Sequence, residues 1–464
     1  MRRASQKSHI KTVLAALIWI GVWQLASMAV GNHLLLASPV DTAVTLASQI
    51  VTPVFWTTVL RSFCHIAVGF LIGFALAVVL GFAAYRLPWL RRLLEPAMDA
   101  LKSIPVVCFI MLLLMWVGPK RVSIITVVIL IFPALYFSVL EGLDSQDHEV
   151  VDELKVMGVK PHVRFQVDTY QQLLPFLVAT CRNMCGMAWK AGVAAEVLAS
   201  PRGTIGEGVY QARLLLNTAN LFSWTITIVL LSWVCERLFL KALTATGPWA
   251  LKRALRNQNR LRPQTSKVPG TIRFVHTVLG YPATSDHAAP VTVSKELTGE
   301  LEGGSWILQD ASGSGKTTCL MTICGLLRPL QGRIEAPVDI ALVCQEPRLV
   351  SALTASENVQ LTSVLTEQGA KELLCELLSE DVLSRPVSEL SGGQKRRVEL
   401  VRALAHPSAL VLLDEPFASL DVQSHYAAAA FIRKHLQGRT LIVSSHVPGD
   451  QELLHAQLLN ILKH

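Results

Sequence analysis

Residues 390–416 read LSGGQKRRVELVRALAHPSALVLLDEP, and this stretch decides how the second half of the chain folds. Its apolar run LVLL predicts a buried strand that ends at Asp414 and Glu415. Two acids at the end of such a strand suit phosphate chemistry, because one can act on Mg²⁺ through water while the other orients or deprotonates an attacking water. We assign the first, metal-binding role to Asp414 and the second, catalytic role to Glu415. In the alternative, both acids only cap the strand.

A glycine-rich loop lies upstream, where residues 308–318 read LQDASGSGKTT. A strand candidate precedes the loop and a helix candidate, CLMTICGLL, follows it, which is the context that a phosphate-binding loop requires. Small residues let backbone amides close around phosphate oxygens, and the helix N-terminus adds a favourable dipole. We expect Lys316 to reach the outer phosphates of ATP and Thr317 to hold Mg²⁺. The other ATP-binding residues expected in the loop are Ser312, Gly313, Ser314, Gly315 and Thr318.

One position of this loop departs from the pattern G-x-x-x-x-G-K-[ST]. Asp310 stands where the pattern has its first glycine. Aspartate tolerates unusual backbone angles better than most residues, so the turn can survive. Its carboxylate would repel a triphosphate unless it points away or is paired. We expect a working site with weakened affinity; the alternative is a copy that no longer hydrolyses ATP.

Together these motifs resemble the ATPase domain of ABC transporters over residues 271–464. The resemblance implies an α/β P-loop domain and gives roles to further residues. Gln345 in LVCQEP is similar to the Q-loop glutamine, which contacts Mg²⁺ in the catalytic site and senses the membrane domain. His446 in IVSSH resembles the catalytic switch histidine, which contacts the terminal phosphate. Tyr281 is the candidate for an aromatic that stacks on the base, and a turn residue is the alternative.

The LSGGQ sequence resembles the signature motif of the family, which binds the phosphates of ATP held by the opposite subunit. The resemblance therefore implies a second copy of the chain as a partner, with two ATP molecules between the two ATPase domains. Asp421, together with Ser419 and Leu420, resembles the D-loop at the same seam. The signature residues expected to bind ATP are Ser391, Gly392, Gly393 and Gln394.

The first half of the chain has the composition of a membrane domain. Hydrophobic residues make up 51% of the chain and charged residues only 16%, whereas soluble proteins carry about a quarter charged residues. We interpret the first apolar stretch as a membrane helix, although a signal peptide is the alternative. Cys181 and Cys185 lack a second ligand pair, so we expect buried thiols. The apolar stretches predict an all-α domain of about six transmembrane helices, near residues 13–30, 65–84, 104–118, 122–143, 174–198 and 221–243.

The positions of lysine and arginine predict the orientation of this domain. They gather before the first stretch, between the second and third and between the fourth and fifth, which places both termini in the cytoplasm. Lys120 and Arg121 fall in a short turn on the extracytoplasmic side and oppose this assignment. We predict a transmembrane domain over 1–245, a basic linker over 246–270 and the ATPase domain over 271–464. The linker suits a surface of anionic membrane lipid rather than nucleic acid.

Sequence features in the first half favour an importer. The segment VVDELKVMGVK resembles the importer "EAA" loop, with Asp152 in its acid position and Gly158 as its glycine; these are the expected coupling residues. Gln171 stands where a proline is expected, and an ordinary amphipathic helix is the alternative. Three stretches, LLLASPVDT, LEPAMDALKSIPVVCFIMLLLMWVG and GMAWKAGVAAEVLAS, resemble permeases of the nitrate/taurine/alkanesulfonate group. In that group the permease and ATPase are usually separate chains, so their fusion is a departure.

Charges inside the fifth apolar stretch are costly and are interpreted first as functional. We expect Arg182 and Glu196, near its ends, to reach the membrane interfaces. Lys190 lies deeper, and we place it on the translocation path, where it would attract an anionic substrate. The alternative is a salt bridge or a carbonyl partner within the bundle.

These observations predict ATP-driven import of a small solute across the cytoplasmic membrane by a homodimer. A separate extracytoplasmic binding protein is expected to deliver the solute, and sulfonate, nitrate and a pyrimidine vitamin precursor all stay open. One alternative is an exporter, whose helices usually continue further into the cytoplasm. Another is a membrane sensor that binds ATP without cycling, which only Asp310 supports.

The departure at Asp310 can be tested by restoring the glycine. Asp310→Gly removes a negative charge beside the expected triphosphate, so the KM for ATP should fall about fivefold, the effect of about 1 kcal/mol of screened repulsion. Steady-state hydrolysis by the purified parent and variant measures this. A parent without turnover and a variant with full activity would show that the loop is inactive as written.

Overall fold

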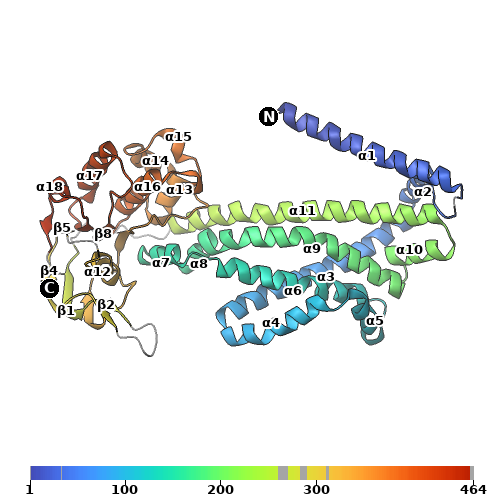
Figure 1. The fold of residues 1–464 in the computed structure, drawn as a ribbon, viewed down its shortest axis with the longest axis horizontal. Coiled ribbons are helices and arrows are strands. Elements are labelled where there is room, and N and C mark those ends of the chain that lie inside the picture. Colours follow the sequence, from blue (N-terminus) through green and yellow to red (C-terminus); the bar gives the residue numbers. More distant parts are fainter. Residues whose placement is uncertain (1, 33, 260–269, 283–289, 310–312, 460–464) are drawn as a thin grey trace. The chain divides into compact units, whose positions relative to one another are not determined.

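The computed structural model describes residues 2–32, 34–259, 270–282, 290–309 and 313–459 (Figure 1). The chain divides into two units. The helical unit comprises Met1–Ser145 and Leu173–Thr246, and the α/β unit comprises Gln146–Gln172 and Gly247–His464. The division at Gly247 lies beside the predicted start of the linker at 246. The α/β unit also takes a short internal segment from the half of the chain predicted to be membrane domain.

The helical unit is built entirely from helices among its described residues (Figure 1). Three of them begin with proline at their first position, where its missing N–H costs nothing. The hydroxyls of Ser38 and Thr52 cap two of these helices. The helices are α1 (Arg2–Val30), α2 (Pro39–Ile50), α3 (Pro53–Arg86), α4 (Pro88–Ser103), α5 (Val106–Val117), α6 (Val122–Asp144), α9 (Tyr170–Ala199), α10 (Ile205–Leu214) and α11 (Thr218–Asn259). The first residues of α9, up to Gln172, and the last residues of α11, from Gly247, belong to the α/β unit.

Helices α3 and α6 pack along each other because α3 presents glycines to α6. A Cβ at Gly69 would lie 2.6 Å from the carbonyl oxygen of Ile124, and one at Gly81 would lie 2.6 Å from Cγ1 of Val139. Small residues at such positions let two membrane helices approach closely. Helix α11 joins the same core, where Phe239 meets Phe70 at a ring-centroid distance of 5.0 Å.

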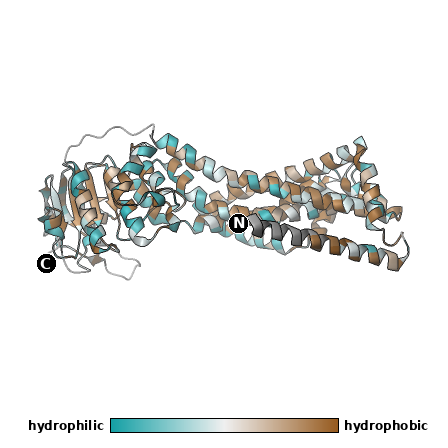
Figure 2. Ribbon diagram, turned by 90° about the horizontal axis from the view of Figure 1, so that it is seen from above, coloured by the Kyte–Doolittle hydropathy of each residue, from teal (hydrophilic) through white to brown (hydrophobic). Residues whose placement is uncertain are grey.

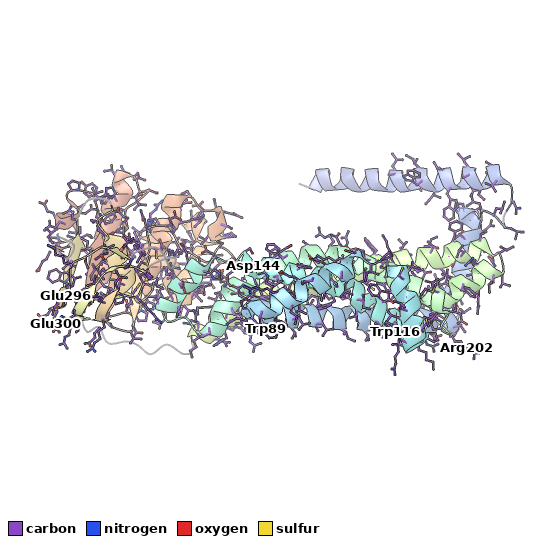
Figure 3. The ribbon with its side chains drawn as sticks, turned by 60° about the horizontal axis from the view of Figure 1, so that its bottom comes forward. Trp89, Trp116, Asp144, Arg202, Glu296 and Glu300 are labelled. Atoms are coloured by element: carbon purple, nitrogen blue, oxygen red, sulfur yellow. The ribbon has the colours of Figure 1, made fainter. Side chains whose placement is uncertain are left out.

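Apolar residues predominate along the long helices of this unit (Figure 2). Within the described residues, α3 and α6 are each long and apolar enough to cross a membrane, and the bent pair α4 and α5 would make a third crossing if it counts as one span. Trp89 and Trp116 project outward from α4 and α5 with exposed fractions of 62% and 72% (Figure 3). Tryptophan is enriched where membrane meets water. The predicted number of six crossings stays a prediction.

The stretch predicted as the third span, 104–118, is not a single straight crossing. Helix α5 has 12 residues, and a helix of that length rises about 18 Å, well short of the roughly 30 Å hydrocarbon core. It meets α4 at an angle of 102°. The break falls at Ile104, whose extended backbone angles are those that a following proline imposes, and Pro105 then begins the new helix.

Glu196 lies in the interior of the helical unit, contrary to the expectation that it reaches an interface. Its side chain is fully buried. Its carboxylate accepts a hydrogen bond from the hydroxyl of Ser62 at 2.6 Å and one from the backbone N–H of Gly206 at 3.4 Å, and it lies 3.3 Å from Nδ1 of His65. The Ser62 hydroxyl in turn accepts the N–H of Ile205 at 2.9 Å. Glu196 therefore ties α3 and the start of α10 to α9.

A five-stranded parallel sheet forms the centre of the α/β unit, in the order β10-β5-β9-β8-β7. Its strands are short and almost wholly apolar, as expected for a sheet covered on both faces. The pattern of strands alternating with helices confirms the predicted α/β class. The strands are β5 (Ser305–Leu308), β7 (Ile340–Val343), β8 (Leu410–Asp414), β9 (Thr440–Ser444) and β10 (Gln457–Leu458).

Two smaller sheets and a set of helices complete this part of the unit. One sheet is antiparallel, in the order β4-β1-β6, and the other pairs β2 with β3. These strands are β1 (Ile272–Val278), β2 (Gly280–Tyr281), β3 (Val291–Thr292), β4 (Leu297–Leu301) and β6 (Gln331–Glu335). The helices are α12 (Lys316–Ile323), α13 (Ala355–Thr362), α14 (Glu367–Cys375), α15 (Glu380–Leu383), α16 (Gly392–Ala405), α17 (Val422–Leu436) and α18 (Asp450–Leu453).

The segment Gln146–Gln172 folds as part of the α/β unit, and we call it the docking segment. It contains α7 (His148–Val156), α8 (Pro161–Arg164) and a π-helical turn, Phe165–Thr169. Its apolar residues Val150 and Leu154 share a buried cluster with Leu353 and with Ala254 of α11. Residues 247–259, predicted to begin the linker, are thus helical and partly packed, and 260–269 lie outside the described residues.

The Glu196 contacts predict a stability effect. Glu196→Leu would leave the Ser62 hydroxyl and the Gly206 N–H without their acceptor in the interior, which costs about 1–3 kcal/mol. We expect a lower unfolding temperature for the detergent-solubilised protein. Arg182→Met, which removes an exposed charge from the same helix, is the matched control. Equal unfolding temperatures for the two variants would mean that the Glu196 contacts carry no stability.

Candidate functional site

The predicted catalytic residues meet at one edge of the parallel sheet. The carboxyl ends of parallel strands lie at the same edge, and each of four strands is followed there by a predicted functional element. The glycine-rich loop follows β5, Gln345 follows β7 and Glu415 follows β8, while His446 comes two residues after β9. Neighbouring strands β8 and β9 are in register, with Asp414 opposite Ser444.

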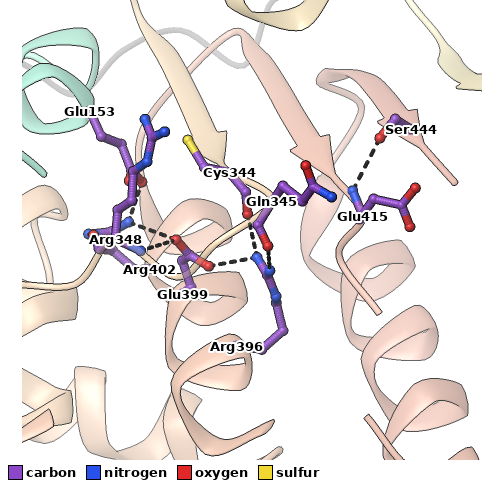
Figure 4. Close-up of polar contacts among 9 residues, drawn as sticks. All are labelled: Glu153, Cys344, Gln345, Arg348, Arg396, Glu399, Arg402, Glu415 and Ser444. Carbon is purple, nitrogen blue, oxygen red and sulfur yellow. Dashed lines mark hydrogen bonds and ion pairs between the residues drawn. The ribbon is translucent and has the colours of Figure 1, made fainter. Parts of the chain in front are cut away.

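Glu415 is held by a network at the ends of β8 and β9. Its backbone is in the left-handed region, with φ of 50°, a conformation that residues other than glycine adopt at a cost and that often marks a functional site. Its N–H lies 3.2 Å from both the carbonyl oxygen and the hydroxyl of Ser444 (Figure 4). The Ser444 hydroxyl donates to Oδ1 of Asp414. Glu415 Oε2 forms a 2.6 Å hydrogen bond with Nδ1 of His446, so the two predicted catalytic side chains contact each other.

The glycine-rich loop leads into α12 through Gly315. Its φ of 94° favours glycine, and a Cβ there would lie only 1.8 Å from Cγ1 of Val293. Lys316 follows as the first residue of α12 and is buried. Gly313 also has a positive φ, of 82°. Asp310 and Ser312 lie outside the described residues.

Tyr281 lies beside this loop. Its hydroxyl is 2.9 Å from Oγ1 of Thr318, and its side chain is half exposed. The contact places an accessible aromatic ring within reach of the first turn of α12, where a bound nucleotide would extend from the loop. This position is compatible with the predicted stacking role.

Unpaired polar atoms at the strand edge fit a Mg-nucleotide. Ser314 Oγ and Asp414 Oδ2 are both buried without a hydrogen-bond partner among the residues that the structure describes. Buried polar atoms in proteins are nearly always paired. A Mg²⁺ ion and phosphate oxygens would satisfy both atoms, with Asp414, Thr317 and Gln345 as the side chains that would hold the metal. The metal would supply charge neutralisation at the phosphates.

The signature residues form the start of α16. The hydroxyl of Ser391 accepts the N–H of Gln394 at 3.3 Å, and Gln394 Oε1 accepts the N–H of Ser391 at 3.0 Å, which is a capping box. Ser391 and Gly392 are exposed. Gly393 lies closer to the D-loop, because a Cβ there would be 2.9 Å from the carbonyl oxygen of Ser419. This exposed helix N-terminus is a ready anion site.

Asp421 caps the next helix, α17. Its carboxylate accepts the N–H of Ser424 at 2.8 Å and the Ser424 hydroxyl at 3.1 Å. These hydrogen bonds lower the pKa of Asp421 below its ordinary value. Ser419, two residues earlier, has a φ of 64°. The segment between β8 and α17 thus presents an exposed acid.

The docking segment contacts the signature helix α16 through Glu153, whereas the predicted coupling residue was Asp152. Asp152 is exposed, whereas Glu153 is fully buried and bonds to the guanidinium of Arg402 (Figure 4). Glu149 pairs with Arg348 at 2.9 Å. Gly158 has a φ of 68° and ends α7, where the N–H of the following Val159 donates to the carbonyl of Leu154.

The same network reaches the Q-loop from α16. Arg396 donates to the carbonyl oxygens of Cys344, at 2.6 Å, and Gln345 (Figure 4). It also pairs with Glu399 at 2.8 Å, and Glu399 accepts the N–H of Arg348 at 2.9 Å. Signature helix, Q-loop and docking segment are therefore joined by buried polar contacts within one unit.

Comparison with known families matches both halves of the chain. Residues 69–239 match the binding-protein-dependent transport system inner membrane component, and residues 301–418 match the ABC transporter family. The cytochrome c biogenesis ATP-binding export protein CcmA of Roseobacter denitrificans is 36% identical over 163 residues, which cover 34% of this chain and 78% of that protein. The chain belongs to the ABC transporter family.

Further relatives resemble its ATPase domain. The aliphatic sulfonates import ATP-binding protein SsuB 2 of Pseudomonas syringae is 34% identical over 215 residues, covering 45% of this chain and 74% of that protein. A solved dimeric post-hydrolysis state of an ATP-binding cassette with ADP and Pi has 24% identity and a TM-score of 0.36, covering 39% of this chain and 90% of its own. This ABC transporter thus joins a helical membrane domain to an ATPase whose hydrolysis is coupled to transport, as the sequence predicted.

A signal in the sequence could have identified Glu153. Val150, Glu153, Leu154 and Met157 are spaced as one face of a helix, and all four are buried. Asp152 falls off that face and is exposed, and its coupling role stays a prediction. The arginines and Glu399 of α16 were missed because three- and four-residue charge spacing is also typical of solvent-exposed helices.

Burial controls the charge state of this cluster. Loss of hydration raises the pKa of Glu153 to about 8, an effect that the attraction of Arg402 only partly offsets. Burial raises the pKa of Glu399 as well. The two carboxylates compete for the same guanidinium, which lies 3.6 Å from Glu399. A neutral, hydrogen-bonding side chain at position 153 is therefore compatible with the docked state.

Glu153→Ala should loosen the docking segment. Arg402 would lose a buried acceptor, at a cost of about 1–3 kcal/mol, and amides of α7 should exchange correspondingly faster in hydrogen-exchange mass spectrometry of the full-length protein. Glu153→Gln should have a smaller effect because it keeps an acceptor and the shape.

The matched control is Asp152→Ala, at the exposed neighbouring acid. We expect it to leave exchange of α7 unchanged. The same acceleration in both alanine variants would show that the burial of Glu153 does not hold the segment in place.

Proposed function

We propose that two copies of this chain form an ATP-driven importer of a small solute in the cytoplasmic membrane, with both termini in the cytoplasm. The observation that carries this proposal is the docking segment, in which Glu153 contacts Arg402 of α16 and the backbone of Met157 contacts His406, the residue that follows α16. A segment of the membrane half buried against the signature helix gives nucleotide-driven motion of that helix a direct mechanical connection.

The need for two copies follows from the placement of the motifs. One chain supplies one glycine-rich loop and one signature sequence, and Ser391 and Gly392 stand exposed at the start of α16. In the proposed homodimer, each signature helix binds the phosphates of the Mg-ATP held by the other copy. Closure of the two ATPase domains would pull on the docking segments and turn the membrane cavity outward, and hydrolysis would reset it.

The membrane half supports import over export. The two curated relatives reported above differ in direction, since one is named for import and the other for export, and both resemble the ATPase half. The match over residues 69–239 is to a component of binding-protein-dependent systems, which supports a separate extracytoplasmic protein that delivers the solute. An exporter would not respond to such a protein.

Within the site, Glu415 is the proposed base and His446 the residue that contacts the terminal phosphate. The 2.6 Å contact between them would position the carboxylate toward the attacking water. Lys190 is exposed on α9, as a residue on the translocation path would be. It supports an anionic solute. The basic residues after α11 would meet anionic membrane lipid.

Glu415→Gln tests whether two copies of the chain dimerise around Mg-ATP. Loss of the base should slow hydrolysis at least about a hundredfold while leaving Mg-ATP bound, so the variant should accumulate as a closed dimer. Mass photometry of the detergent-solubilised protein with Mg-ATP measures the assembly. Adding Lys316→Ala, which removes the phosphate contact, is the control that should abolish nucleotide-dependent closure. A lone subunit under all conditions would contradict the proposal.

A further inference from the structure

A buried carboxylate follows the segment that carries His446. Asp450 begins α18, and its side chain is fully buried. The chain turns back just before it, at Gly449, whose φ of 97° favours glycine. Nε2 of His425, on α17, lies 2.8 Å from Asp450 Oδ1, and the ring nitrogen carries the proton of this bond because an ionised carboxylate only accepts. Within the described ranges no lysine or arginine pairs with Asp450, so His425 is the side chain that supplies a ring donor to this buried acid.

The other carboxylate oxygen of Asp450 fixes the residues on both sides of His446. The hydroxyl of Ser445 donates to Asp450 Oδ2, and the same hydroxyl accepts the backbone N–H of Val447 at 3.1 Å. The carbonyl oxygen of Val447 accepts from the side-chain amide of Gln309, which follows β5, at 3.0 Å. These bonds hold the backbone around His446, while its side chain stays exposed.

The ring of His425 is itself fixed by two contacts. It stacks on Phe417, with ring centroids 4.2 Å apart and ring planes 16° apart. Its backbone N–H donates to the carbonyl oxygen of Asp421 at 2.8 Å, in the first turn of α17. Phe417 lies two residues after Glu415. His425 therefore connects the segment after β8, which carries Glu415, to the segment after β9, which carries His446.

We propose, on the basis of the function proposed above for His446, that His425 is a positioning residue for ATP hydrolysis. It acts through Asp450 and Ser445 on the backbone that carries His446. A backbone fixed before nucleotide binds leaves less freedom to lose in the transition state. None of these bonds is made to a phosphate, so their loss should lower kcat and leave the KM for ATP nearly unchanged. A bridge that only stabilises the fold would instead change the unfolding temperature and leave kcat as it is.

Basal ATP hydrolysis by the full-length protein in nanodiscs tests this role. His425→Ala should lower kcat about tenfold and change the KM for ATP less than about twofold, because the buried carboxylate loses its donor. His425→Phe keeps a ring that can stack on Phe417 but has no donor, so it should be equally slow. His425→Gln keeps an N–H donor and should recover at least about half of the parent kcat. Full activity in His425→Phe, or no recovery in His425→Gln, would overturn the assignment.

His435 on the same helix gives the matched control. Its side chain is 18% exposed, as that of His425 is, and its Nε2 lies 3.1 Å from a carboxylate oxygen of Glu376. That pair joins α17 to the end of α14 instead of to the segment after β9. His435→Ala should therefore leave kcat unchanged. An equal loss of kcat in both alanine variants would show that hydrolysis responds to any weakening of α17, and would overturn the assignment.

A double-mutant cycle tests whether His425 acts through His446. His446→Ala should lower kcat by itself. Adding His425→Ala should then lower kcat by less than about twofold more, because the group being positioned is already gone. Losses that multiply would overturn the assignment. Ser445→Ala, which removes the hydroxyl between Asp450 and Val447, gives a second cycle with the same expectation should His425→Ala fold poorly.

The single variants separate this role from the proposed function. If His446→Ala hydrolyses ATP as fast as the parent, the proposed role of His446 is wrong, and the positioning role of His425 is wrong with it. If His446→Ala is slow while His425→Ala is as fast as the parent, only the positioning role is wrong.

Discussion

The buried guanidinium of Arg402 is the constraint on which the coupling part of this transporter depends. A charge taken fully out of water must be met by acceptors, or its desolvation cost of several kcal/mol remains. Arg402 is fully buried and finds the carbonyl of Arg348, at 2.9 Å, together with the carboxylates of Glu153 and Glu399. One of these acceptors belongs to the docking segment, so the guanidinium of Arg402 loses a carboxylate partner whenever that segment is not in place.

This constraint links three elements of the α/β unit, which are α16, the end of β7 and the docking segment. Arg396, on the same helix as Arg402, holds the backbone carbonyls of Cys344 and Gln345 at the end of β7. Glu399 lies between the two arginines and accepts from the backbone of the Q-loop segment. A displacement of α16 toward a nucleotide would therefore act on the Q-loop and the docking segment through the same set of buried contacts. The contacts depend on one another, because Arg402 is shared by two carboxylates and Glu399 by two arginines.

The sequence predicted those parts of the structure whose causes are local. The run LVLL before Asp414 became β8 because a continuous apolar stretch of that length is buried in a parallel sheet. Gly313 and Gly315 both have positive φ angles, which favour glycine. The glycine-rich pattern between a strand candidate and a helix candidate therefore predicted this loop. The α/β class and the helical first half followed from the same patterns.

The sequence did not predict contacts between residues that lie far apart in the chain. It also did not predict which residues of a motif are buried. Glu196 was expected at an interface, but Ser62, 134 positions away, and the start of α10 bury it. The third span was predicted to be short and to begin after Pro105, where α5 does begin, but the angle of 102° between α4 and α5 depends on packing that the sequence pattern does not give. Asp152 was assigned from its place in a motif, and its role stays a prediction; the buried acid is the neighbouring Glu153, which shares the helical spacing of Val150, Leu154 and Met157.

The fusion of both halves in one chain has a consequence for the departure at Asp310. In a transporter with two different ATPase chains, an altered loop in one can be compensated by an intact loop in the other. In the proposed homodimer both loops carry Asp310, and both are completed by the same intact Ser391, Glu415 and His446. The two nucleotide sites of a homodimer are identical in sequence, so either both hydrolyse ATP or neither does. Glu415 is held by Ser444 and contacts His446, so each copy keeps the proposed base beside the proposed switch residue. That geometry favours two working sites over two inactive ones.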